Sequence, residues 1–295
     1  MKKKIKKDRL IFNFTGYSLT FLFASLCLIP FLLVISGSFT NEDSVLREGY
    51  RMIPRVFSLE AYEFIFKAPK QIIDAYTVTI LLVVCGTAIA LFLTSMTAYV
   101  LHKKDFRYRN RFSYFFYFTT LFSGGLVPWY ILMVKYLNLK NSFLALLLPN
   151  LFSVFNIIIM RTFMGSIPVA IGESAKVDGA GEFTIYSRLI LPMSAPALAT
   201  IGLFIALGYW NDWYAAMLFI TKPEMYPLQY FLYKALNSMA AASKIAEKTG
   251  IPIPDMPKES FKLAMTVVAT GPIVFLYPFV QRYFIKGITI GAVKG

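Results

Sequence analysis

The chain has 295 residues, of which 57% are hydrophobic and 16% are charged, and its formal net charge is +14. Soluble domains are about 45–50% apolar and about 25% charged. This excess of apolar residues excludes an ordinary soluble domain and indicates a protein that lies in lipid.

Six apolar runs along the chain are long enough to cross a bilayer, which takes about 20 residues of helix. We expect helices, because an open strand edge cannot satisfy its backbone polar groups in hydrocarbon. The expected spans are residues 10–36, 73–101, 112–134, 142–160, 195–220 and 263–284. The whole chain, residues 1–295, is therefore predicted to be one all-α transmembrane domain.

Dense clusters of Lys and Arg set the expected orientation, since such clusters resist translocation. They occur in MKKKIKKDR at residues 1–9 and in HKKDFRYRNR at residues 102–111, which lie on the same side of the membrane if six spans are present. We expect both termini and the connection 161–194 in the cytoplasm and the connection 221–262 outside. Nucleic acid is not an expected partner, because no dense basic patch lies on a soluble face.

The N-terminus has two possible interpretations, a cleavable signal peptide and an uncleaved first span. The apolar run at 10–36 is longer than the roughly 7–15 residues of a signal core, which favours the uncleaved span. The two cysteines, Cys27 and Cys85, both fall inside expected spans and offer neither a metal-binding pair nor a disulfide framework.

Catalytic chemistry has little support in the sequence. The chain has one histidine, His102, in a basic connection, and it has neither a G-x-x-x-x-G-K-[ST] phosphate loop nor an H-E-x-x-H zinc motif. We predict no catalytic residue and no metal site, which leaves transport as the broad class. Ion-coupled carriers place several ionisable groups at membrane depth, whereas the spans here offer mainly Asp212, with Asp74 near an end.

The stretch ESAKVDGAGEFTIYSRLILP, residues 173–192, carries charge between two apolar runs. It is predicted to form two short helices: Pro168 suits the first turn of one, and Gly179 and Gly181 allow a sharp turn before the other. The second helix carries one apolar face, formed by Phe183, Tyr186, Leu189 and Ile190. Such a hairpin could pack on the chain's own helix ends, lie on the lipid surface, or bind a partner.

The same stretch resembles the signature loop of binding-protein-dependent ABC importer permeases. In that family the pattern is E-A-A, three residues, Gly, nine residues, Ile, one residue, and Leu-Pro. This chain has Glu173-Ser174-Ala175, Gly179, Leu189 and Leu191-Pro192 at the same spacing, so it departs at Ser174 and Leu189 only. Both departures keep the size or the apolar character of the side chain.

Further motifs extend the resemblance over about residues 10–295, to the maltose-type carbohydrate-uptake family and its branch for oligosaccharides and polysaccharide fragments. They are LFSGGLVPWYILMVKYLNLKNSFLALLLPN, FNIIIMRTFMGSIP, GYWNDW and YPFVQRYFIKGITIGAVKG. The resemblance implies the ABC type I importer permease fold and a transport subunit, not an enzyme. It also implies a bacterial plasma (inner) membrane location and import of a carbohydrate by alternating access.

The family also implies a set of partners. They are a second homologous permease, two cytoplasmic ATPase subunits that bind ATP and Mg, and an extracytoplasmic solute-binding protein, so no cofactor is expected on this chain. The helix after Pro168 would be the coupling helix, seated in a groove on an ATPase subunit. The implied coupling residues are Glu173, Ser174, Ala175, Asp178, Gly179, Ala180, Leu189, Leu191 and Pro192.

Candidates for the substrate pathway combine flat rings with polar groups. They are Asn156, Trp210, Asn211, Asp212, Trp213 and Tyr214. The rings could instead form an aromatic belt at the outer interface, and Asn156 could hydrogen-bond between helices. The connection 221–262 is either a plain loop or, as in maltose-type systems, a docking segment for the binding protein. Two other classes stay open: an ion-coupled secondary sugar transporter and a structural membrane scaffold.

Overall fold

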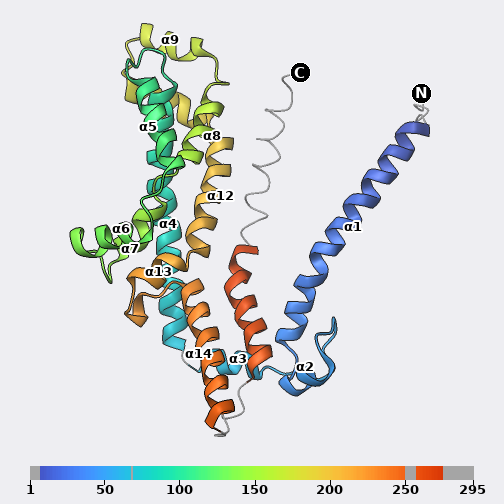
Figure 1. The fold of residues 1–295 in the computed structure, drawn as a ribbon. Helices are drawn as coiled ribbons and strands as arrows, with labels where there is room; N and C mark the ends of the chain where they lie inside the picture. Colours follow the sequence, from blue (N-terminus) through green and yellow to red (C-terminus); the bar gives the residue numbers. More distant parts are fainter. Residues whose placement is uncertain (1–6, 68, 250–256, 275–295) are drawn as a thin grey trace. The chain divides into compact units, whose positions relative to one another are not determined.

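The computed structural model describes residues 7–67, 69–249 and 257–274. These residues form helices joined by short connections, with one isolated antiparallel bridge between Thr40 and Phe57. The chain divides into two units, residues 1–69 with 235–271 and residues 70–234 with 272–295. Figure 1 shows the order of the helices along the chain.

Two single helices are long and apolar enough to cross a membrane, α1 (Lys7–Ser38) and α4 (Pro69–His102). They coincide with the predicted spans 10–36 and 73–101. Three further helix pairs pass the same test but bend by more than 40° at a short break, so the described residues hold up to five spans. The predicted sixth span, 263–284, lies partly outside the described residues, which are helical from 258 to 274.

The predicted span 112–134 is two helices that meet at 111°. The first is α5 (Arg109–Leu121), and the second is α6 (Leu126–Ile131) continued by a π-helical turn, η1 (Leu132–Tyr136). Gly125 stands before α6 with φ 85°, a conformation that side chains with a Cβ rarely adopt. The chain leaves α5 in extended backbone at Phe122, and Gly125 then turns it into α6.

The predicted span 142–160 is also bent, by 48°. It consists of α7 (Phe143–Leu147) with the 3₁₀ turn η2 (Leu148–Asn150), followed by α8 (Val154–Met164). The Ser153 hydroxyl caps α8 by accepting a hydrogen bond from a backbone N–H of its first turn. This cap restarts the helix in a new direction.

The predicted span 195–220 is interrupted at Asp212. α12 (Ala195–Asn211) ends there in extended backbone, and α13 (Tyr214–Phe219) begins two residues later. The Asp212 Oδ1 accepts hydrogen bonds of 3.0 and 3.1 Å from the N–H groups of the first two residues of α13. An Asp side chain that accepts hydrogen bonds from the first N–H groups of a helix favours the start of a new helix over continuation of the preceding one.

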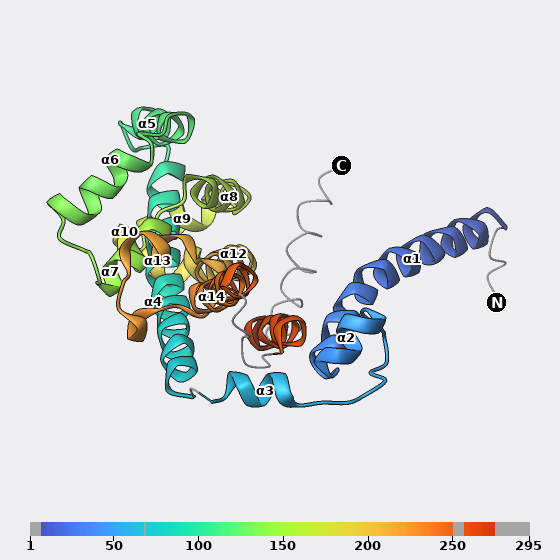
Figure 2. The same ribbon diagram turned by 60° about the horizontal axis from the view of Figure 1, so that its bottom comes forward.

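The second unit is built around α4, which α12 and α13 accompany in both views (Figures 1 and 2). A Cβ added at Gly86 of α4 would overlap the ring of Tyr209 of α12, and one at Gly202 would touch Leu91 at 3.1 Å. The Tyr209 hydroxyl donates a 2.8 Å hydrogen bond to the carbonyl of Leu147. Small residues thus let α4 and α12 approach closely, and Tyr209 fixes both to α7.

In the first unit, the end of α1 is joined to two short helices, α2 (Glu42–Glu48) and α3 (Glu60–Ile65). The hydroxyls of Ser38 and Tyr62 lie 2.8 Å apart, and the ring of Phe39 stacks on that of Tyr62 at 4.9 Å. These contacts hold the connection between the first two spans against the end of α1.

The Glu42 carboxylate caps the helix of residues 258–274. It accepts hydrogen bonds from the backbone N–H groups of Glu259 and Ser260 and from the Ser260 hydroxyl. A carboxylate at a helix N-terminus satisfies free N–H groups and complements the helix dipole. The start of the last described helix is therefore fixed by a residue more than two hundred positions earlier.

Much of the predicted external connection 221–262 is helical. It holds the 3₁₀ turn η4 (Pro223–Met225) and the long helix α14 (Leu228–Thr249). Most of its proline-rich segment, residues 250–256, lies outside the described residues. The same holds for the basic residues 1–6 and for the motif at 277–295.

The α4–α12 contact predicts an effect of Gly86→Ala. The added Cβ meets the Tyr209 ring, which is 1% exposed and bonded at its hydroxyl, so the two helices must separate at a cost of about 1–3 kcal/mol. We expect a lower thermal midpoint of unfolding in detergent. Gly208→Ala, where a Cβ meets nothing within 4 Å, is the matched control for helix propensity. Equal midpoints for the two variants would contradict this packing argument.

Candidate functional site

The charged stretch after α8 folds into a helical hairpin. Its first helix is α9 (Val169–Val177), directly after Pro168, and its second is α10 (Glu182–Ile185). The second helix runs on through the π-helical turn η3 (Tyr186–Ile190) and α11 (Leu191–Met193). Figure 1 shows α9 near the end of the second unit where α4 finishes and α5 begins.

The turn between the two helices depends on Gly179, which has φ 81°. Its N–H donates to the Lys176 carbonyl at 3.0 Å, and the Ala180 N–H donates to the Ala175 carbonyl at 2.9 Å. These two bonds form a Schellman motif, which needs a left-handed residue at this position. Gly181, by contrast, has φ −70° and is open to any residue type on backbone grounds.

The Glu182 carboxylate joins three separate elements. Its Oε2 accepts hydrogen bonds from Lys103 Nζ at 2.8 Å and from the Tyr99 hydroxyl at 2.7 Å, both at the end of α4. Its Oε1 accepts from Lys176 Nζ of α9 at 2.9 Å, and Lys176 also reaches Asp105 at 3.3 Å. We call Tyr99, Lys103, Asp105, Lys176 and Glu182 the Glu182 network.

Glu182 lies in the predicted cytoplasmic connection, and its pKa is lowered from 4.5 to about 2. The main causes are hydrogen bonds from Lys103, Lys176 and Tyr99, which favour the charged carboxylate. The pKa of Lys176 is raised, first by its hydrogen bond to Glu182 and then by that to Asp105. The carboxylate thus stays ionised at any physiological pH and keeps α9 attached to α4.

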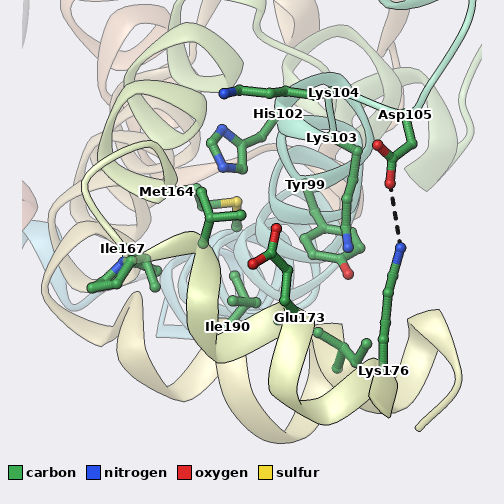
Figure 3. A pocket seen from close by; sticks show the side chains of 14 residues that line it. Tyr99, His102, Lys103, Lys104, Asp105, Met164, Ile167, Glu173, Lys176 and Ile190 are labelled. Atoms are coloured by element: carbon green, nitrogen blue, oxygen red, sulfur yellow. Dashed lines mark hydrogen bonds and ion pairs between the residues drawn. The ribbon is translucent and has the colours of Figure 1, made fainter. Parts of the chain in front are cut away.

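A cavity of about 210 Å³ lies between α9 and the end of α4. Figure 3 shows Glu173 pointing from α9 toward the α4 end, where His102 and Lys103 lie, and Lys176 reaching Asp105. Acids and bases from both sides line this cavity together with apolar side chains such as Met164, Ile167 and Ile190. The contact between α9 and the end of α4 therefore combines ion pairs with apolar packing.

The structure divides the predicted coupling residues into two groups. One group is exposed and accessible to a partner: Glu173, Ser174, Asp178, Gly179 and Pro192. The other is half-buried and packs on the core: Ala175, Ala180, Leu189 and Leu191. Val177 at 88% and Phe183 at 63% exposure extend the outer group with apolar surface.

Sequence reasoning missed the Glu182 network. Its signal was present as opposite charges in the connections 102–111 and 161–194, but their spacing does not say which acid meets which base. Only the fold brings Tyr99 and Glu182, 83 residues apart, within hydrogen-bond distance.

Four of the predicted substrate residues lie together. Asn211, Asp212, Trp213 and Tyr214 line one open hollow of about 360 Å³, which other elements complete with Trp129, Pro149 and Asn150. The Asn150 side-chain amide donates to the second Asp212 oxygen at 3.1 Å, so η2 is tied to the break between α12 and α13. The interruption that ends α12 therefore also forms this hollow.

The other two predicted substrate residues lie elsewhere. Trp210 is 8% exposed and lines a separate, almost wholly apolar cavity with residues of α4, including Ile80 and Val84. Asn156 is 7% exposed and sits in the first turn of α8, where its backbone N–H donates to the Ser153 hydroxyl at 3.4 Å. The hollow contains neither residue.

Comparison with known proteins defines the class. Residues 90–290 match the family described as "Binding-protein-dependent transport system inner membrane component", and the chain belongs to this family. The resemblance read from the signature loop is confirmed. With two single helices apolar enough to cross a membrane, the protein is a membrane-embedded component of a transport permease.

Individual relatives are similar over nearly the whole chain. The "Polygalacturonan/rhamnogalacturonan transport system permease protein YtcP" of Bacillus subtilis (strain 168) is 38% identical over 289 residues, 98% of this chain and 100% of that protein. The "Arabinooligosaccharides transport system permease protein AraQ" of the same strain is 26% identical, covering 96% and 98%. A solved structure of "a bacterial ABC transporter involved in the import of the acidic polysaccharide alginate" has TM-score 0.79 and 28% identity, covering 96% and 100%.

The Glu182 network predicts that the stability of α9 depends on pH and on the charge of Glu182. In Glu182→Gln the ion pairs to Lys103 and Lys176 are lost, so the amides of α9 should exchange with solvent faster than in the wild type. Because the folded pKa is depressed, the stabilisation is present above 4.5 and is lost as the pH falls toward about 2. Hydrogen exchange measured at several pH values tests both points.

The control for this experiment is Glu173→Gln, which changes an exposed acid of α9 that makes no ion pair among the described residues. Its exchange should match that of the wild type. If Glu182→Gln and Glu173→Gln behave alike at neutral pH, the network does not hold α9.

Proposed function

We propose that this chain is the permease subunit of a bacterial ABC importer that carries an oligosaccharide, released from a larger polysaccharide, into the cytoplasm. The support is the family itself and three relatives whose names concern polygalacturonan and rhamnogalacturonan, arabinooligosaccharides, and alginate. All three are carbohydrates built from many or several sugar units. The chain itself is a transport subunit and carries no catalytic residue.

The coupling element in this proposal is α9. The observation that carries it is the two-sided character of the hairpin: Ser174, Asp178 and Gly179 are exposed, while Lys176 ties the same helix to the end of α4 through Glu182. An exposed helix held on one side by ion pairs can enter a groove on a partner and still transmit force. Movement of an ATPase subunit would then pass through α9 to the spans.

The remaining assignments follow from this role. The chain pairs with a second homologous permease, two ATPase subunits and an extracytoplasmic solute-binding protein. It crosses the membrane six times, with both termini in the cytoplasm and the connection 221–262 outside, facing the binding protein. ATP and Mg bind to the ATPase subunits, and closure of these subunits switches the pathway between inward- and outward-facing states.

The alternative of an ion-coupled secondary sugar transporter has no support in the geometry. Such a carrier needs an ionisable group at membrane depth that is free to exchange its ion or proton. Asp212 accepts two hydrogen bonds from the start of α13 and one from Asn150. These three hydrogen bonds hold the break after α12 and give Asp212 a structural role.

Reconstitution tests the importer role. In proteoliposomes that contain this chain, its permease partner and the ATPase subunits, loaded binding protein should stimulate ATP hydrolysis severalfold over the basal rate. Sugar uptake should require ATP. Uptake driven by an ion gradient in the absence of the ATPase would overturn the proposal.

Gly179→Leu tests the coupling helix. A residue with a Cβ at φ 81° is strained by roughly 1–2 kcal/mol, so the turn should shift and the association with the ATPase should weaken by about tenfold. Membrane insertion should be unchanged, because a Cβ at Gly179 meets nothing within 4 Å. Co-purification and stimulated ATP hydrolysis are the measurements.

The matched control is Gly181→Leu, which adds the same side chain two residues later. Gly181 also has open space around it but has φ −70°, so no backbone strain is expected. Equal association of the two variants with the ATPase would count against the turn at Gly179 as the determinant of coupling.

A further inference from the structure

A row of aromatic rings leads into the hollow at the end of α12. The Trp213 ring stacks on Tyr233 of α14 with centroids 4.6 Å apart and planes 23° apart. Tyr233 in turn lies nearly parallel to Tyr230 at 6.3 Å, and Tyr230 meets Tyr226 edge to face at 4.8 Å. The inner rings are buried, whereas Trp213 and Tyr233 are 37% and 38% exposed.

This exposure pattern differs from that of an aromatic belt, in which each ring separately meets the lipid interface. Here the buried Tyr226 and Tyr230 fix the orientation of the exposed pair, so little ordering is needed when a ligand binds. Trp129 also lines the hollow and is held edge to face against Phe219 at 5.0 Å. Flat, pre-oriented ring faces suit the C–H face of a sugar ring.

The polar groups of the hollow include several hydrogen-bond acceptors. The side-chain amides of Asn150 and Asn211 donate to Asp212 and to the Leu207 carbonyl, and an amide side chain also carries an oxygen that can accept a hydrogen bond. The Asp212 oxygens retain lone pairs beyond the three hydrogen bonds that they accept. Sugar hydroxyls are the donors that such oxygens bind.

The charge of the hollow is negative. Asp212 is its carboxylate, and none of the described residues that line it is Lys, Arg or His. A ligand carboxylate placed there would face a like charge without a compensating cation. The volume of about 360 Å³ is within the roughly 300–1,000 Å³ of small-molecule sites.

We infer that this hollow, lined by Trp213 with Tyr233 stacked behind it, binds an uncharged sugar unit of the transported oligosaccharide and rejects a uronate at the same position. The inference rests on the proposed function and adds to it the charge of the sugar unit that this chain contacts. In this inference, carboxylates elsewhere on the same oligosaccharide bind to other surfaces of the importer.

The test measures sugar binding to the assembled importer in nanodiscs by the change in tryptophan fluorescence. The probes are maltotriose, which is uncharged, and a galacturonate trisaccharide. The uncharged probe should bind more tightly, and Trp213→Phe should reduce the fluorescence signal, with Trp129 left as a second reporter in the hollow. Tyr233→Ala removes the ring that orients Trp213 and should weaken binding by at least about tenfold.

Two further variants test the effect of charge and control for nonspecific effects of removing an aromatic ring. Asp212→Asn keeps a residue able to cap α13 but removes the charge, so it should improve binding of the galacturonate probe relative to maltotriose. Tyr117→Ala removes an exposed ring of α5 that is outside the hollow and should bind like the wild type.

Equal affinity of the wild type for the two probes, or unchanged binding in Tyr233→Ala, would overturn the inference. Failure of both probes to bind while ATP-driven uptake persists would also overturn it, and would leave the importer role intact. Sugar uptake that does not depend on ATP would instead contradict the proposed function.

Discussion

The contact on which the rest of the structure depends is the set of hydrogen bonds at Glu182. One carboxylate, with its pKa lowered to about 2, binds a tyrosine of α4, the lysine directly after α4 and a lysine of α9. Apolar side chains of α9, such as Ile171 and Ala175, also pack on the core. Ion pairs on a half-exposed surface tolerate small shifts in geometry, which suits the coupling role proposed for α9.

Much of the fold is readable from the sequence, but the bends are not. Apolar runs located α1 and α4 well, because length and hydropathy alone decide whether a helix can cross a membrane. The bends in the three helix pairs depend on single residues, whose effect is lost when hydropathy is averaged over a whole span. At Gly125 the cause is a backbone conformation, and at Asp212 it is a side chain that caps the next helix.

The candidate site shows the same division. The spacing around Gly179 identified the hairpin, and its positive φ explains why glycine stands there. Pairings across distant segments, such as Tyr99 with Glu182 or Trp213 with Tyr233, could not be predicted, because each residue has many possible partners until the fold places them. The GYWNDWY motif was predicted to act as one group, yet the structure separates Trp210 from the hollow that its neighbours form.

The helix α12 has its two ends at the two sites. Its first residue follows the hairpin after a bend of 81°, and its last residue precedes Asp212 at the hollow. Its 17 residues make a rod of about 25 Å at roughly 1.5 Å per residue, with Tyr209 anchoring it near the far end. A helix fixes the rotation of its two ends about the helix axis as well as the distance between them. One residue inserted into α12 would rotate Asp212 by about 100° about the helix axis relative to the hairpin. The number of residues in α12 therefore fixes the relative orientation of the two sites.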